Sequence, residues 1–88
     1  MIKIWVDFHN ASKTGIRLNC IETKNDLAKQ KVELEDGMKL FLWQEDFDDN
    51  NLRDNLLVEG VAKYNKVDKI WEAFINWDEI RHESDLRK

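Results

Sequence analysis

The sequence predicts a mainly β domain: a small five-stranded antiparallel barrel with a short internal helix and a short C-terminal helix. Apolar residues recur at every second position in five segments of the chain, as half-buried strands require. Short connections join these segments, and a short sheet that closes on itself hides its edges. A chain of 88 residues has room for one hydrophobic core, so residues 1–88 are expected to form a single domain.

The first two strands are expected at residues 1–9 and 16–20. Their apolar side chains share one face within each segment: Ile2, Ile4, Val6 and Phe8, then Ile16, Leu18 and Cys20. Residues 10–15 between them are rich in turn-forming residue types. The two strands are therefore predicted to pair with each other in an antiparallel manner.

The internal helix is expected near residues 26–30, which are good helix formers. Thr23 supplies a hydroxyl at the N-cap position, and Asp26 favours the positive end of the helix dipole. Asp36-Gly37 then reverses the chain, because glycine accepts the positive φ that such a turn needs.

The last three strands are expected at residues 38–43, 56–64 and 71–77. Segment 38–43 is apolar on both faces, which indicates a central or covered strand. Gly60 lies where a curled sheet bends without a Cβ clash. Asn76 is positioned to cap a final helix over residues 78–84.

Five strands in so short a chain favour an SH3-like barrel, with an OB-like barrel carrying an inserted helix as the alternative. Three segments resemble a family of small uncharacterised bacterial proteins: Trp5-Val6-Asp7-Phe8-His9-Asn10, Leu57-Val58-Glu59-Gly60 and Asn76-Trp77-Asp78-Glu79-Ile80-Arg81-His82. The resemblance covers nearly the whole chain. It implies an SH3-like β-barrel, and it implies no activity.

Charge and composition narrow the classes of partner. The net charge is −4 and no run of clustered Lys or Arg is present, so neither DNA nor RNA is an expected partner. One open alternative is a small basic face made of Lys3, Lys13, Arg17 and Lys39. No apolar run approaches the roughly 20 residues that span a bilayer, so no membrane partner is expected. The single Cys cannot form an internal disulfide, and the expected location is cytoplasmic.

An acidic loop spans residues 45–59 between two apolar strands. Four of its side chains match ligand positions of an EF-hand-like loop and are candidate Ca²⁺ ligands: Asp46, Asp48, Asn50 and Asp54. The match is incomplete, because Leu57 stands where the bidentate Glu belongs and Asn51 replaces the turn glycine. The other interpretation is a solvated loop in which Asp and Asn hold turns and charge discourages edge association. No other cofactor is expected.

Catalysis is the weakest interpretation of the titratable side chains. The candidates for acid-base or nucleophilic work are Asp7, His9, Cys20 and His82. No paired spacing of Cys or His is present, so zinc ligation is not indicated. The sequence predicts a protein that is not an enzyme.

A surplus of aromatic side chains carries the functional prediction. Trp5, Phe41 and Trp43 lie off the alternating core face, and Lys3 and Lys39 neighbour them in the sequence. Exposed rings on a rigid sheet are good anchors for a protein or peptide partner, including a second copy in a homodimer. The alternative is that the two helices cover these rings as a second layer of core. The sequence thus predicts an interaction module with these five residues as its binding patch.

Overall fold

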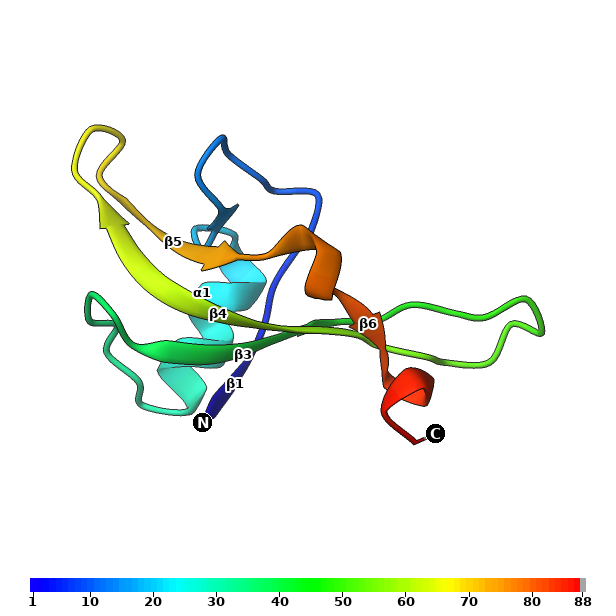
Figure 1. Ribbon diagram of the computed structural model, residues 1–88. Helices are drawn as coiled ribbons and strands as arrows, with labels where there is room; N and C mark the ends of the chain where they lie inside the picture. The colour runs from blue at the N-terminus through cyan, green and yellow to red at the C-terminus, as the bar shows by residue number, and fades with distance from the viewer. Residues whose placement is uncertain (88) are drawn as a thin grey trace.

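The computed structural model describes residues 1–87, which form one mixed sheet, one α-helix and two 3-10 turns (Figure 1). The elements follow in the order β1 (Ile2–Trp5), β2 (Ile16–Arg17), α1 (Ile21–Lys29), β3 (Lys39–Gln44), β4 (Leu56–Asn65), β5 (Ile70–Ile75), η1 (Trp77–Glu79), β6 (Arg81–His82) and η2 (Glu83–Arg87).

The six strands lie in the order β1-β3-β4-β5-β2, and β6 pairs with β4 beyond the end of β5. Hairpin connections join β3 to β4 and β4 to β5, so both pairs are antiparallel. β1 pairs with β3 in parallel, because the long connection between them, which contains α1, brings the chain back to its starting side. Segment 38–43 was predicted to be a central or covered strand, and β3 is central because it lies between β1 and β4.

The mainly β class is confirmed, but the closed five-stranded antiparallel barrel is wrong. β1 and β2, which were expected to form a hairpin, lie at opposite ends of the sheet, and the sheet does not close. The cause lies in residues 6–9, which were expected to continue the first strand. Val6 and Phe8 leave β1 and bury their side chains in the core, so the chain crosses the inner face of the sheet before β2 begins.

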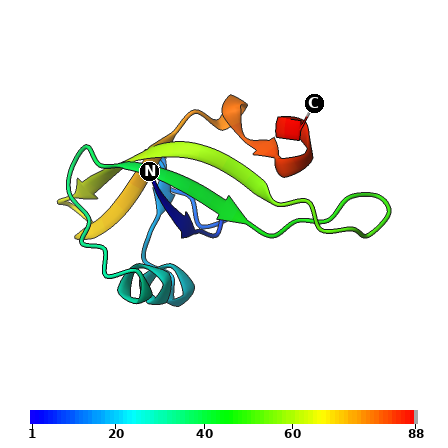
Figure 2. The ribbon, with the colours of Figure 1, turned by 90° about the horizontal axis from the view of Figure 1, so that it is seen from below.

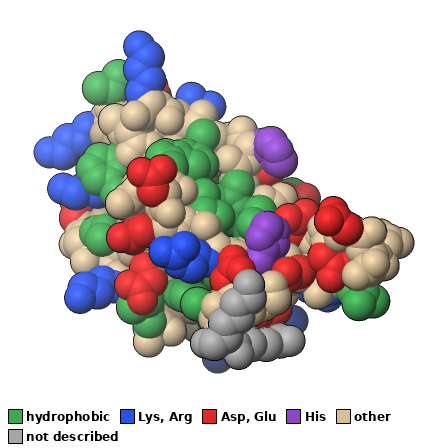
Figure 3. Space-filling model, turned by 45° about the vertical axis from the view of Figure 1, so that its right-hand side comes forward, with side chains coloured by type: hydrophobic (Ala, Val, Ile, Leu, Met, Phe, Trp, Pro, Cys, Tyr) green, Lys and Arg blue, Asp and Glu red, His purple; other side chains and the backbone are tan. Residues whose placement is uncertain are grey.

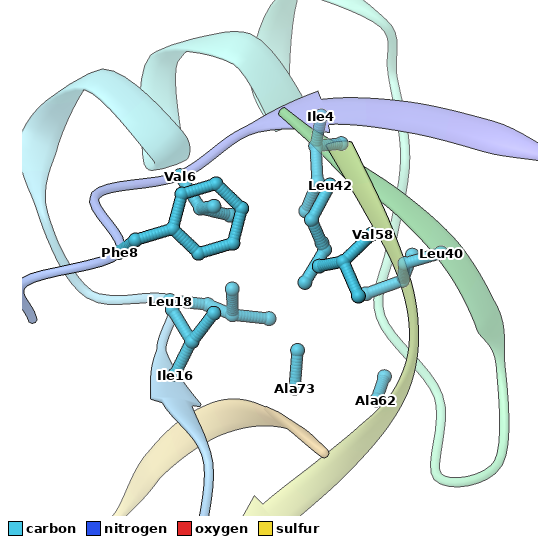
Figure 4. Packing of buried hydrophobic residues seen from close by; sticks show 10 residues of the cluster. All are labelled: Ile4, Val6, Phe8, Ile16, Leu18, Leu40, Leu42, Val58, Ala62 and Ala73. Carbon is cyan, nitrogen blue, oxygen red and sulfur yellow. The ribbon is translucent and has the colours of Figure 1, made fainter. Parts of the chain in front are cut away.

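The core occupies the inner face of the sheet (Figure 4). Its buried members are Ile4, Val6, Phe8, Ile16, Leu18, Leu40, Leu42, Val58, Ala62 and Ala73. Leu27 of α1 packs against this cluster, and Figure 2 shows α1 and the C-terminal segment on opposite sides of the sheet. The opposite, outer face of β1 and β3 is therefore not covered by the helix.

Helix α1 protects the free edge of β1 with hydrogen bonds from one of its faces. The Thr23 hydroxyl donates to the Trp5 carbonyl at 2.9 Å, and the Trp5 N–H donates to Asp26 Oδ2 at 2.8 Å. Just beyond the helix, Gln30 Nε2 donates to the Lys3 carbonyl at 2.8 Å. The predicted N-cap role of Thr23 is thus wrong: the helix begins earlier, after Cys20, and the buried Thr23 hydroxyl serves the strand edge instead.

The C-terminal segment is not the single helix that was expected over residues 78–84. Asn76 does cap a turn, because its side chain accepts from the Asp78 N–H at 3.1 Å. The turn ends after Glu79, and β6 then pairs with the start of β4. Strand pairing thus interrupts the expected helix and leaves two short 3-10 turns.

Candidate functional site

The structure brings together the aromatic residues of the predicted binding patch. β1 and β3 are neighbours, with Trp5 directly opposite Trp43 and Lys3 directly opposite Phe41. Residues that are paired across two strands share a face, so all four side chains lie on the outer face. The three rings are partly buried, and each keeps some of its surface exposed. We call Trp5, Phe41 and Trp43, with Lys3 and Lys39 at the rim, the aromatic patch.

Two cations lie over the Trp43 indole, and one carboxylate links the Trp5 indole to one of them. Lys3 Nζ lies 5.5 Å from the centre of the Trp43 ring, and Arg53 Cζ lies 5.8 Å from it. Glu45 Oε2 accepts from Trp5 Nε1 at 2.7 Å, and its other oxygen is 3.9 Å from the Arg53 guanidinium. Cations over an indole face gain from its quadrupole. Arg53 is therefore part of the site, and the signal for it was its position as the one cation of the acidic loop.

Shallow hollows adjoin the aromatic patch on the outer face. One, of about 270 Å³, lies among Phe41, Leu57 and Leu86, so the C-terminal segment stands beside the Phe41 ring. The other, of about 300 Å³, includes Lys39 and the exposed Phe74 in its lining. Glu59 and Glu79 line both hollows, so the patch continues into surface that is partly apolar and partly acidic.

The acidic loop is a β-hairpin that projects from the body of the molecule (Figures 1 and 2). Phe47 pairs with Arg53 in an isolated bridge, and Asp48 Oδ1 accepts from the N–H groups of Asn50 and Leu52, both at 2.9 Å. Asn51 has a φ of 61°, a conformation that Asn tolerates. We call residues 45–55 the projecting hairpin, and Figure 3 shows acidic side chains gathered over it.

The four predicted Ca²⁺ ligands have different partners. Asp46 Oδ2 lies 2.8 Å from His82 Nε2, Asp54 binds the Ser84 hydroxyl at 2.7 Å, and Asp48 holds the hairpin turn. Asn50 is exposed near the tip. Within residues 1–87, no group of three or more His, Cys, Asp or Glu side chains is placed to hold a metal ion. Ca²⁺ binding therefore stays a prediction to be tested.

The Asp46–His82 pair is the main electrostatic feature at the base of the hairpin. The hydrogen bond to His82 is the largest cause that lowers the pKa of Asp46 below its ordinary value. The same bond is the largest cause that raises the pKa of His82, and the carboxylates of Asp54 and Asp85 add to it. Each partner thus stabilises the charged form of the other.

The catalytic candidates are dispersed among separate partners. His9 Nδ1 lies 3.4 Å from Asp7 Oδ1, on a side chain that is 92% exposed. Cys20 Sγ contacts the Thr23 hydroxyl at 2.9 Å. In the part of the chain that the structure describes, Cys20 has no hydrogen bond to a histidine. Among the four candidates, the described residues thus pair His9 with Asp7, while the thiol of Cys20 has the Thr23 hydroxyl as its partner.

Glu72 is a buried carboxylate in β5, next to the core residue Ala73. Its side chain is 2% exposed, and it accepts from Thr14 Oγ1 at 2.5 Å and from Asn65 Nδ2 at 3.4 Å. Burial by itself would raise the pKa of Glu72, but hydrogen bonds from Thr14, Ser12 and Asn65 outweigh it and the pKa is lowered. Because its partners come from the loop before β2 and from the last residue of β4, Glu72 ties residues 12–14 to the end of β4.

Comparison with known proteins adds no assignment. No family model matches the chain, and neither the search of curated proteins nor the search of solved structures finds a match. The resemblance to a family of small uncharacterised bacterial proteins therefore stays a prediction. No helix among residues 1–87 is long and apolar enough to cross a membrane.

Proposed function

We propose that this protein is a non-enzymatic interaction module whose aromatic patch binds an apolar segment with acidic flanks. The observation that carries the proposal is the pairing of Trp5 with Trp43 on the outer face, with Lys3 and Arg53 over the Trp43 ring. The proposed partner is a protein or a peptide and not a nucleic acid. The proposed location is a reducing compartment such as the cytoplasm, because the single cysteine, Cys20, cannot form an internal disulfide.

The chemistry of the patch favours this class of partner. Large aromatic rings on a rigid sheet supply binding energy when they lose water, and two neighbouring strands hold these rings in fixed positions. Cations at the rim attract acidic flanks and speed encounter. Lys3, Lys39 and Arg53 supply cations at the rim, alongside the carboxylates of Glu45 and Glu59.

The four tryptophans make a direct test possible, because each indole N–H gives its own NMR signal. The probe is a synthetic peptide with Phe and Leu between Asp residues, and its control has Lys in place of every Asp. We expect the acidic peptide to shift the indole signals of Trp5 and Trp43 in a saturable way. Trp71, which packs edge-on against Tyr64 with ring centres 5.2 Å apart, and Trp77 are expected to stay unchanged. Equal shifts with the basic peptide would contradict the proposed role of charge.

A pair of substitutions separates binding from folding. The double variant Trp5→Ser and Trp43→Ser is expected to abolish the peptide response while the fold persists. The control variant Trp77→Ser, which removes a 48% exposed ring outside the aromatic patch, is expected to keep the peptide response. If the double variant unfolds, its two rings belong to the core. Lys3→Glu with Lys39→Glu then decides, because it retains every ring: unchanged peptide binding by this variant would overturn the proposal.

A further inference from the structure

One face of the projecting hairpin continues the aromatic patch. Lys39, Phe41 and Trp43 share the outer face of β3, and Glu45 stays on that side because it bonds Trp5. Phe47 follows the same alternation, and it pairs with Arg53, which lies over Trp43. We call the row Lys39, Phe41, Trp43, Glu45 and Phe47 the outer stripe.

The charges at the two ends of the outer stripe are opposite. Lys3 and Lys39 lie at the end on the body of the molecule, and Asp48 and Asp49 lie at the hairpin tip. The two ends are about 30 Å apart for an extended strand of this length. Such a row complements a copy of itself that runs in the opposite direction, because each basic end then meets an acidic tip.

The tip of the projecting hairpin has exposed apolar side chains with acidic neighbours, which is the kind of segment that the aromatic patch is proposed to bind. Phe47 and Leu52 are 57% and 63% exposed, and acidic residues flank them. The β4–β5 turn has the opposite net charge: Val67 there is 89% exposed, and its neighbours are Lys66, Asp68 and Lys69. The basic rim of the patch attracts the first segment and repels the second.

We propose that the partner of the aromatic patch is a second copy of this chain, bound through a reciprocal exchange of projecting hairpins. The two outer stripes pack antiparallel about a two-fold axis, so that Phe47 of each copy lies on the Phe41 and Trp43 rings of the other. Asp49 of each copy then faces Lys39 of the other. The exchange makes every contact twice, as in an isologous dimer. The inference rests on the proposed function, because it names the occupant of that patch.

Charge reversal tests the exchange by sedimentation velocity over a concentration series. The parent chain is expected to dimerise. Lys39→Glu alone or Asp49→Lys alone is expected to raise the dissociation constant of the dimer by about tenfold or more, because like charges then meet at both contacts. An equimolar mixture of the two variants pairs opposite charges at both contacts. We expect it to dimerise about as well as the parent.

The control for this experiment is Lys66→Glu, which reverses a charge on the other hairpin and is expected to leave the dimer unchanged. Failure of the mixture to recover dimerisation overturns the exchange, and so does a parent chain that stays monomeric at every concentration. A monomeric parent whose Trp5 and Trp43 signals still respond to the acidic peptide overturns only the self-association. A dimer that ignores both charge variants uses another surface and also overturns the exchange.

Discussion

Individual hydrogen bonds at the base of the projecting hairpin fix the C-terminal segment. Asp46 binds the His82 ring, and Asp54 accepts from both the N–H and the hydroxyl of Ser84, at 2.9 and 2.7 Å. Two carboxylates that resembled metal ligands in the sequence thus act as partners for His82 in β6 and for Ser84, which follows it. Their bonds hold the hairpin and the C-terminal segment against each other.

The Asp46–His82 pair predicts a defined dependence of stability on pH. The pKa of His82 is raised, so its contribution is fully present below its ordinary value of 6.5 and is lost as the pH rises through the folded-state value. The pKa of Asp46 is lowered, so its contribution is present above 3.8 and is lost as the pH falls through the folded-state value. We expect Asp46→Asn to lower the free energy of unfolding more near pH 5.5 than near pH 8.5, as measured by urea denaturation.

The matched control for this prediction is His9→Gln, at the other histidine, whose side chain is almost fully exposed. This variant is expected to unfold with the same pH dependence as the parent protein. An Asp46→Asn penalty of equal size at both pH values would show that the pair does not contribute as an ion pair.

At the scale of the elements, α1 completes the sheet through side chains instead of a strand. An edge strand exposes N–H and C=O groups that invite pairing with other chains. Thr23, Asp26 and Gln30 bind the exposed backbone of β1 at Trp5 and Lys3. The helix therefore serves two purposes: it adds Leu27 to the core and it shields the edge.

This arrangement predicts the effect of removing one acceptor from α1. Asp26→Ala is expected to speed hydrogen exchange of the Trp5 amide and to destabilise the fold by about 1–2 kcal/mol, the usual cost of losing the partner of a partly buried amide. Asp26→Asn keeps an acceptor oxygen and should largely preserve protection. Equal exchange rates in parent and Asp26→Ala would show that the edge is protected by packing alone.

At the scale of the whole molecule, the patch and the Ca²⁺ hypotheses predict different responses to metal. Ca²⁺ needs about six to eight oxygen ligands. Three of the four candidate ligands, Asp46, Asp48 and Asp54, already form hydrogen bonds within their own chain. We expect the melting temperature to stay the same with EDTA or with millimolar Ca²⁺. Saturable heat at micromolar Ca²⁺, absent in an Asn50→Ala control, would reverse this expectation.

The local pattern of the sequence determined most of the elements and the face on which each side chain lies. Alternation predicted the segments that became β3, β4 and β5, and it placed Phe41 and Trp43 on the face opposite Leu40 and Leu42. This succeeds because the period of a strand is set by its own backbone. The acidic loop was likewise recognised, because charge and turn-forming residues are local properties.

Only the tertiary structure decided which strands are neighbours. The parallel pairing of β1 with β3 puts Trp5 beside Trp43, and the departure of Val6 and Phe8 into the core sends β2 to the far end of the sheet. Arg53 likewise reaches Trp43 only through the folded hairpin. The apolar period of a strand is the same whichever strand lies beside it. The pairing of strands depends instead on how residues distant in the sequence fill a common core.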